Sequence, residues 1–312
     1  MRLQFGAGVL TAIGNTPLVE LVRVVPGGAA RVVAKLESAN PTGSMKDRMA
    51  LALVERAAAE GRLPPGGTVV EYTAGTTGVS LALVCAALGY RAHFVFSDAF
   101  SDEKRFTMRA YGADITDVPS DNKRITESLI KAMIAKAGEI SRQPGNWWCD
   151  QLSNADGELG YHSLGDELWR QAGERVDVFV QSVSTAHSIH GTAQALRAHN
   201  SRLRVVAVEP AESAVLSGQP SGAHQIEGIG IGFIPPLWRP DRVDEIETVT
   251  TSEAMEMARR LAREEGIFAG VSTGANVVAA LRLAGRLGPQ ATVATIIVDS
   301  GLRYVSREVF RG

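Results

Sequence analysis

Residues 68–97, TVVEYTAGTTGVSLALVCAALGYRAHFVFS, carry the pattern that decides the fold class. The β-branched and aromatic residues of 68–73 and of 92–97 predict two buried strands. Between them, glycines and threonines mark a turn, and the apolar stretch 80–88 predicts a buried helix. Strands that alternate with helices in this way form parallel sheets, so this stretch indicates an α/β protein.

The same alternation extends along the rest of the chain. Further apolar, β-branched runs predict buried strands at 32–37, 115–118, 176–183, 205–210 and 294–300. Amphipathic stretches predict helices at 49–60, 125–136 and 160–171. Thr250-x-x-Glu253 forms a capping box ahead of another helix, which should end at Gly266. We therefore predict largely parallel sheets flanked by helices.

The length of the chain predicts two domains. A chain of 312 residues is longer than one hydrophobic core usually supports. The clearest break in the middle of the chain is QPGN (143–146), where a proline and a glycine are adjacent. We place the domain division near this break.

Composition and charge argue against several classes of protein. The chain has 32 Lys and Arg against 34 Asp and Glu, and this net charge of −2 gives no basic surface for nucleic acid or membrane lipid. The most apolar stretch, 79–90, suits a buried helix better than a membrane span, and the N-terminal residues do not resemble a signal peptide. Cys85 and Cys149 form no disulfide framework, so a cytoplasmic location is expected.

Lys46 lies in NPTGSMKDRM (40–49), where a Pro/Gly turn leads into a helix. The positive end of the helix dipole weakly disfavours a charged lysine in the first turn. The position therefore suits a lysine that works as a neutral amine. The alternative is a solvated lysine near a helix start, which is the more frequent case when spacing alone is considered.

Two further junctions between strand and helix could hold anions, because ligands collect at such junctions in α/β proteins. In EYTAGTTG (71–78), hydroxyls and amides precede a helix. They either form an anion site or are an ordinary N-cap cluster. In SVSTAHSIHG (182–191), hydroxyls, amides and histidines could hold a phosphate. His187 and His190 are three residues apart, but no carboxylate or cysteine accompanies them, so no metal site is expected.

Two glycine-containing strings match known motifs, but the residues that each motif requires elsewhere in the chain are absent. GVSTG (270–274) matches the nucleophile elbow of α/β-hydrolases, which requires a histidine after the serine. All six histidines precede Ser272, so the hydrolase interpretation fails. GIGIG (228–232) hints at a dinucleotide loop, but the following Phe-Ile-Pro-Pro cannot open a helix.

Seven strings, in the same order and across nearly the whole chain, resemble the cysteine synthase branch of the fold-type-II pyridoxal-phosphate enzymes. They are IGNTPLV (13–19), NPTGSMKDR (40–48), TAGTTG (73–78), QLSN (151–154), STAHS (184–188), IEGIGIGFIP (226–235) and DSGLRYVS (299–306). Each string is a weak signal by itself, and the seven in order are a strong one.

The resemblance implies a role for each of these strings. Lys46 would be the catalytic residue and would bind pyridoxal 5'-phosphate as a Schiff base. Thr76 would approach the phenolic oxygen of the cofactor, and Ser272 its pyridine nitrogen. The cofactor phosphate would be bound by Ser184, Thr185, Ala186, His187 and Ser188. The substrate would be bound by Thr73, Ala74, Gly75, Thr77 and Gln151.

The expected phosphate loop departs from the family pattern GTGGT, because Ser184, Ala186 and His187 replace its glycines. We expect the Oγ atoms of Ser184, Thr185 and Ser188 to compensate by facing the phosphate. His187 should lie at the edge of this cup, where it either adds a charge-assisted contact when protonated or points to solvent. TAGTTG (73–78) corresponds to the loop that binds the substrate carboxylate in the family, and we call it the carboxylate loop. It departs from the family pattern TSGNTG, because Ala74 and Thr76 replace a serine and an asparagine.

The resemblance also implies the architecture and the reaction. The smaller domain would comprise 40–145, and the larger one 1–39 and 146–312, each with a mostly parallel sheet. The reaction would replace the β-substituent of O-acetylserine or O-phosphoserine with sulfide or a similar nucleophile, giving cysteine or a cysteine-like amino acid. A homodimer is expected, without nucleic-acid or membrane partners. A serine/threonine dehydratase and a non-catalytic scaffold of the same fold remain alternatives.

Overall fold

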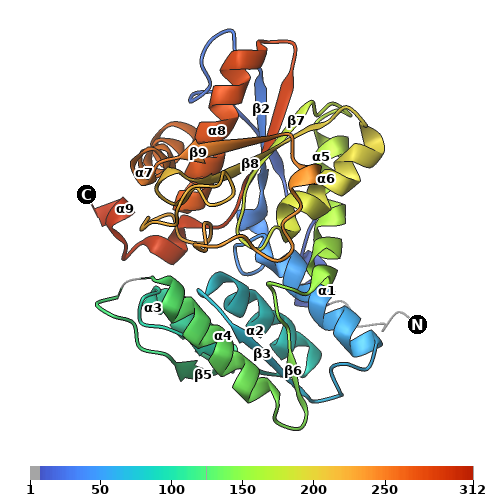
Figure 1. Ribbon diagram of the computed structural model, residues 1–312. Helices are drawn as coiled ribbons and strands as arrows, with labels where there is room; N and C mark the ends of the chain where they lie inside the picture. The colour runs from blue at the N-terminus through green and yellow to red at the C-terminus, as the bar shows by residue number, and fades with distance from the viewer. Residues whose placement is uncertain (1–7, 124, 312) are drawn as a thin grey trace.

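The computed structural model describes residues 8–123 and 125–311, and within them two sheets organise the chain (Figure 1). The larger sheet has the strand order β1-β2-β10-β7-β8-β9, and the smaller has the order β5-β4-β3-β6. β1 runs antiparallel to β2, and all other neighbouring strands are parallel. The expected α/β fold with mostly parallel sheets is confirmed.

The strands and helices have the following bounds. The strands are Leu18–Leu21 (β1), Arg31–Leu36 (β2), Thr68–Tyr72 (β3), Arg91–Phe96 (β4), Asp114–Asp117 (β5), Asn146–Trp148 (β6), Val178–Ser182 (β7), Arg204–Pro210 (β8), Glu245–Val249 (β9) and Thr292–Ile297 (β10). The α-helices are Lys46–Ala59 (α1), Thr76–Leu88 (α2), Asp102–Ala110 (α3), Glu127–Ser141 (α4), His162–Gln171 (α5), His187–His199 (α6), Thr251–Arg260 (α7), Val271–Leu287 (α8) and Glu308–Arg311 (α9).

The central strand β10 is buried along its whole length because both faces of the larger sheet are covered. Figure 1 shows α7 and α8 on one side of this sheet and α5 and α6 on the other. Val293 and Ile297 pack into the core on the α8 side, whereas Ala294 and Ile296 pack into the other core. Successive side chains of a strand point to opposite faces, so a strand buried on both faces has no polar alternation.

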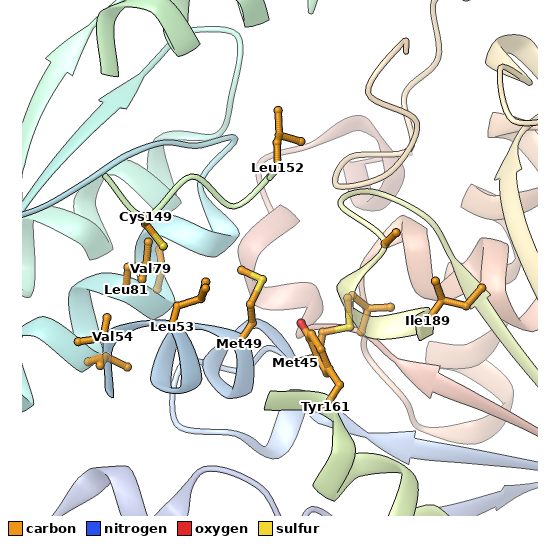
Figure 2. Packing of buried hydrophobic residues seen from close by; sticks show 14 of the residues in the cluster. Met45, Met49, Leu53, Val54, Val79, Leu81, Cys149, Leu152, Tyr161 and Ile189 are labelled. Atoms are coloured by element: carbon orange, nitrogen blue, oxygen red, sulfur yellow. The ribbon is translucent and has the colours of Figure 1, made fainter. Parts of the chain in front are cut away.

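Helix α1 joins the two parts of the molecule. Figure 2 shows Met45, just before α1, and Met49 and Leu53 along it, between Cys149 at the smaller sheet and Ile189 on α6. All five side chains are buried in one continuous core. Lys46 therefore begins a helix that is packed against both parts.

Most of the expected elements are present, and their bounds differ in instructive ways. α1 and α2 begin three and four residues earlier than predicted, because the polar junction residues themselves form the first helical turn. β1, β6 and β9 were not predicted: they are short, and β9 carries acidic residues at the edge of its sheet. The capping box of Thr250 and Glu253 is present, and the helical segment ends at Gly266 with φ 70°.

One domain boundary needs a correction. The division after residue 145 assigned 146–148 to the larger domain, whereas these residues form β6 and pair with β3 of the smaller sheet. The Pro-Gly break is the turn that leads into this strand and not the link between domains. We propose that the chain passes to the larger domain after Trp148.

Candidate active site

A cavity of about 350 Å³ lies between the two parts of the molecule. Its wall includes Lys46 at the start of α1, residues 72–74 and 76–77 at the end of β3 and after it, Ser184 and Thr185 after β7, and the loop 221–232. A smaller pocket of about 30 Å³ adjoins it and shares Lys46 and Thr76 with it. The loops that follow β3 and β7 line the cavity together, which is where ligands collect in parallel sheets.

Lys46 is the first residue of α1, and only 7% of it is exposed. Burial lowers the pKa of its amine to about 8, and the negative charge of Asp299 opposes that shift. About a tenth of the amine is therefore neutral at pH 7, far more than for a lysine with an ordinary pKa. The structure gives Lys46 the environment that its position at a helix start predicted, and it is not a solvated lysine.

Two backbone amides of the loop 73–78 donate hydrogen bonds within the loop and are not available to a ligand. The Thr73 Oγ1 atom accepts hydrogen bonds from the amides of Gly75 (2.9 Å) and Gly78 (3.0 Å). The Gly75 amide, which we expected to face the substrate, therefore points at Thr73. The amides of Thr76 and Thr77 lie in the first turn of α2, where a helix has no internal acceptors. These two amides are the better donors for an anion in the cavity.

Gly75 keeps this loop close to α3. Its φ of 113° is a conformation that L-residues rarely adopt, and a Cβ atom there would lie 2.4 Å from the Cδ atom of Lys104. Both observations exclude a larger residue at this position. The loop is thus packed directly on the aliphatic part of the Lys104 side chain.

Thr77 and Gln151 are joined by a hydrogen bond at the wall of the cavity. The Thr77 hydroxyl donates to Gln151 Oε1 (2.8 Å), and Gln151 Nε2 donates to the carbonyl of Tyr72 (3.0 Å). The Gln151 amide proton is bound by the buried carboxyl of Glu71 (2.9 Å). Burial raises the pKa of Glu71 to about 8. Gln151 is therefore positioned by three contacts before any substrate binds.

The smaller pocket brings together most of the expected cofactor residues. Those that line it are Lys46, Thr76, Ser184, Thr185, Ser188 and Ser272. Two buried polar atoms in its wall, Ser182 Oγ and Asp299 Oδ1, have no hydrogen-bond partner among the described residues. Buried polar atoms without partners are costly, so the pocket has the character of a site for a polar ligand.

Ala186 precedes α6 in a left-handed conformation. Its φ is 72°, a value that is common for glycine and rare for alanine. This left-handed conformation explains why the family has a glycine at this position. Ala186 adopts the same conformation although it is not a glycine. This conformation starts α6 at the expected phosphate loop, so the free amides of the first helical turn are at that loop.

His187 does not occupy either expected position. Its side chain is fully buried, its Nε2 atom is 2.8 Å from the carbonyl of Asn154, and its Nδ1 atom is 2.8 Å from the Thr185 hydroxyl. Burial lowers the pKa of His187 to about 3. The expected charge-assisted contact with a phosphate is therefore wrong, and so is the alternative of a solvent-facing ring.

The position of His187 also corrects the expectation for Thr185. A carbonyl oxygen only accepts, so the Nε2 atom carries the proton and Nδ1 of the neutral ring accepts from Thr185. The Thr185 hydroxyl proton is thus directed at His187 and not at the cavity. Ser188 accepts from Gln181 (3.2 Å) and keeps its own proton for another partner.

We expect His187→Asn to flatten the dependence of stability on pH. The unfolded chain protonates this histidine below about pH 6.5, whereas the folded chain keeps it neutral down to about pH 3. Its contribution to stability is therefore complete above pH 6.5 and decreases toward pH 3, by up to about 1.4 kcal/mol per pH unit. Urea unfolding of both proteins between pH 8 and pH 4 measures this, and parallel curves would contradict it.

Several further titratable residues line the two cavities and were not selected from the sequence. Among them are Lys104, Glu227, Asp299 and Tyr304. Lys104 Nζ bonds Glu227 Oε2 at 2.7 Å and lies 4.7 Å from the centre of the Tyr304 ring. Glu227, Asp299 and Tyr304 belong to strings that carried the resemblance, but a string alone does not say which of its side chains face a cavity.

Comparisons with known proteins agree with this geometry. Residues 9–299 match the family of pyridoxal-phosphate-dependent enzymes. The chain therefore belongs to this family, and pyridoxal 5'-phosphate is its cofactor. The resemblance, the fold class and the cofactor expected from the sequence are confirmed.

The relatives identify the branch of the family. The cysteine synthase of Staphylococcus aureus is 41% identical over 300 residues, which cover 96% of this chain and 95% of that protein. The solved O-ureido-L-serine synthase has a TM-score of 0.91 at 37% identity and covers 99% of this chain and 96% of its own. The O-acetylserine-dependent cystathionine β-synthase of Helicobacter pylori has a TM-score of 0.91 at 33% identity, with 99% and 100% covered. The chain is thus a cysteine synthase-like enzyme.

Within the described ranges, no helix is long and apolar enough to cross a bilayer. Nor does any group of three or more His, Cys, Asp or Glu side chains among the described residues have the arrangement of a metal site.

Proposed function

We propose that this enzyme replaces the β-substituent of a serine-derived amino acid with sulfide or a similarly small nucleophile, giving cysteine or a cysteine-like amino acid. The observation that carries the proposal is the buried Lys46 amine, with its lowered pKa, in a cavity between a carboxylate loop and a hydroxyl-lined pocket. The relatives, which include a cysteine synthase and an O-acetylserine-dependent enzyme, support it.

The residues of the smaller pocket fit pyridoxal phosphate. Lys46 would bind it covalently, Ser184, Ser188 and the N-terminus of α6 would bind its phosphate, and Ser272 would lie at its pyridine nitrogen. When bound, this cofactor supplies an electron sink for carbanion chemistry. The orphaned hydroxyl of Ser182 supplies one more donor in the same wall. Lys46, once released, would act as the base for the α-proton of the substrate.

The substrate carboxylate would bind at the N-terminus of α2. The amides of Thr76 and Thr77 and the hydroxyl of Thr73 are the donors there, because Thr73 accepts two hydrogen bonds and retains its own proton. The dipole of α2 favours the negative charge at this end. Gln151 would hold the Thr77 side chain in place.

We propose that the β-substituent is uncharged, as an acetate ester is. Among the described residues that line the larger cavity, the lysines are Lys46 and Lys104, and Lys104 is paired with Glu227. His224 uses both ring nitrogens on the backbone, at 2.8 Å from the carbonyl of Gly230 and 3.2 Å from the amide of Ile226. A phosphate ester needs cationic or several amide donors, so this wall favours O-acetylserine over O-phosphoserine.

Product analysis tests the proposed reaction. The enzyme is incubated with O-acetylserine or O-phosphoserine, each with and without sulfide, and the amino acid and keto acid products are quantified. We expect cysteine to form from O-acetylserine only when sulfide is present. If pyruvate forms at the same rate with and without sulfide and no cysteine appears, the enzyme is a dehydratase-type eliminase.

Thr73→Val should weaken the binding of the amino-acid substrate by roughly 10-fold or more, because the Thr73 hydroxyl, which we assign to the charged carboxylate, is lost while the side-chain volume is kept. The absorbance of the lysine-bound cofactor should remain. Spectral titration with O-acetylserine measures the affinity. Thr107→Val is the matched control, because the Thr107 hydroxyl bonds only the carbonyl of Glu103 on an exposed face of α3. Equal affinities in both variants would reject the assignment.

The oligomeric state and the compartment are separate proposals. We propose a homodimer in the cytoplasm, which rests on the resemblance and on the two cysteines, both free and buried. Sedimentation of the purified chain would show a monomer if the first part is wrong.

A further inference from the structure

Asp299 is a buried acid at the cavity wall to which the proposed reaction assigns no role. Only 2% of it is exposed, and it lines the smaller pocket together with Lys46 and Ser272. Its Oδ2 atom accepts a hydrogen bond from the Tyr304 hydroxyl (2.7 Å), whereas Oδ1 has no partner among the described residues. A buried carboxylate oxygen without a donor is costly unless a positive charge lies near it.

The backbone brings Asp299 next to the start of α1. The amide of Met45 donates to the carbonyl of Val298 (3.0 Å), and the amide of Ser300 donates to the carbonyl of Gly43 (2.9 Å). These bonds pair Asp299 with Ser44 in an antiparallel bridge, two residues before the reactive lysine. Main-chain pairing, rather than a flexible loop, therefore holds Asp299 beside the start of α1.

Gly270 leaves room for Asp299 Oδ1, the carboxylate oxygen without a partner among the described residues. A Cβ atom on Gly270, the residue before α8, would lie 2.5 Å from Asp299 Oδ1. This is closer than any real contact, so a larger residue would force the carboxylate to move. The position of Oδ1 is thus fixed on one side by Gly270 and on the other by the bond of Oδ2 to Tyr304.

We propose that Asp299, oriented by Tyr304, is the counter-ion of Lys46 and determines how readily its ε-ammonium group loses a proton. The inference rests on the proposed function only in taking Lys46 as the residue that binds the cofactor. A carboxylate in a buried site favours the charged form of a neighbouring amine, and burial opposes it. The lysine must be neutral to bind the cofactor, and it must be basic enough to accept the α-proton, so the balance between the two effects matters for both steps.

The other charges that face Asp299 come from three segments. Arg303 and Lys104 favour its carboxylate form, and Glu227 opposes it. Burial raises the pKa of Asp299, and the charge of Arg303 and the hydroxyl of Tyr304 limit that rise. Because Lys104 is already bonded to Glu227, Lys46 is, among the described residues that line the cavity, the lysine without a bonded carboxylate.

The test is the pH dependence of Lys46 acetylation in the full-length chain freed of cofactor. Acetic anhydride labels neutral amines, and peptide mass spectrometry reads the extent at Lys46. We expect a midpoint near pH 8 in the unmodified chain. Asp299→Asn should lower the midpoint by about one pH unit or more, because a nearby opposite charge is removed. Glu227→Gln is the matched control: it removes another acid of the same cavity and should shift the midpoint far less.

An unchanged midpoint in Asp299→Asn overturns the proposal, and so does an equal shift in Glu227→Gln. If Asp299→Asn does not fold, Tyr304→Phe decides. It keeps the carboxyl group but removes its donor, so the carboxylate is less stable and the midpoint should fall by a smaller amount. No shift in that variant also rejects the proposal. The acetylation measurement uses neither cofactor nor substrate. A negative result therefore rejects the role of Asp299 without bearing on whether Lys46 binds the cofactor.

Discussion

Lys46→Ala should abolish the covalent attachment of pyridoxal phosphate and lower the turnover of every amino-acid substrate by at least about 10³-fold. The loss combines the attachment point with the base for the α-proton, and removal of a general base alone costs about 10²–10⁴-fold. Lys46 is suited to both roles because it is buried, faces the cavity and has a pKa of about 8. Visible absorbance of the purified variant and steady-state turnover measure the two effects.

Lys104→Gln is the control for this variant, because it changes the other lysine of the same cavity wall. Its amine is bonded to Glu227 and lies over the ring of Tyr304, so it is not available for attachment. We expect the absorbance of the bound cofactor to persist in Lys104→Gln. The reverse pattern, with absorbance kept in Lys46→Ala and lost in Lys104→Gln, would show that Lys104 carries the cofactor.

Arg48→Met should lower the free energy of unfolding by about 3–5 kcal/mol, the usual cost of leaving buried charges without their partner. The guanidinium group bonds Glu37 (2.7 Å) and Glu167 (2.8 Å), and only 2% of the Arg48 side chain is exposed. Arg48 lies two residues after Lys46 on α1, so these bonds also anchor the start of the catalytic helix. Urea unfolding followed by tryptophan fluorescence measures the effect.

Lys136→Met is the matched control, because it removes a cation whose partner is exposed. Lys136 pairs with Glu139 one turn away on α4, and 38% and 59% of the two side chains are exposed. Exposed pairs contribute about 0–1 kcal/mol, so this variant should unfold near the urea concentration of the unmodified protein. Equal destabilisation by the two substitutions would mean that the Arg48 network does not stabilise the fold.

The fold class was predictable because the parallel strands are buried on both faces. Runs such as 176–183 and 294–300 are rich in apolar residues and lack a regular alternation with polar ones, and the strands that they overlap are buried at every position. The strands that were not predicted are the ones for which tertiary pairing outweighs local pattern. β6 has three residues and exists because β3 pairs with it, and β9 forms a sheet edge although it carries two glutamates.

The site was predictable as a set of loops but not as a set of contacts. The sequence indicated the junctions that line the cavity, since helix starts with hydroxyls and glycines have a recognisable composition. It did not indicate that His187 turns inward to Asn154 and accepts a hydrogen bond from Thr185, because the orientation of the ring depends on packing against the distant segment that contains Asn154. For the same reason Asp299 was not selected: only the bridge to Ser44 places it beside the lysine.

The most direct test of the central claim is to locate the cofactor by peptide mass mapping after borohydride reduction. The enzyme as purified should carry the reduced cofactor on the peptide that contains Lys46. After incubation with O-acetylserine, that peptide should be unmodified, because the lysine has been released to act on the substrate. Cofactor on any other lysine, or a Lys46 peptide that stays modified in the presence of every amino acid tested, would contradict the account.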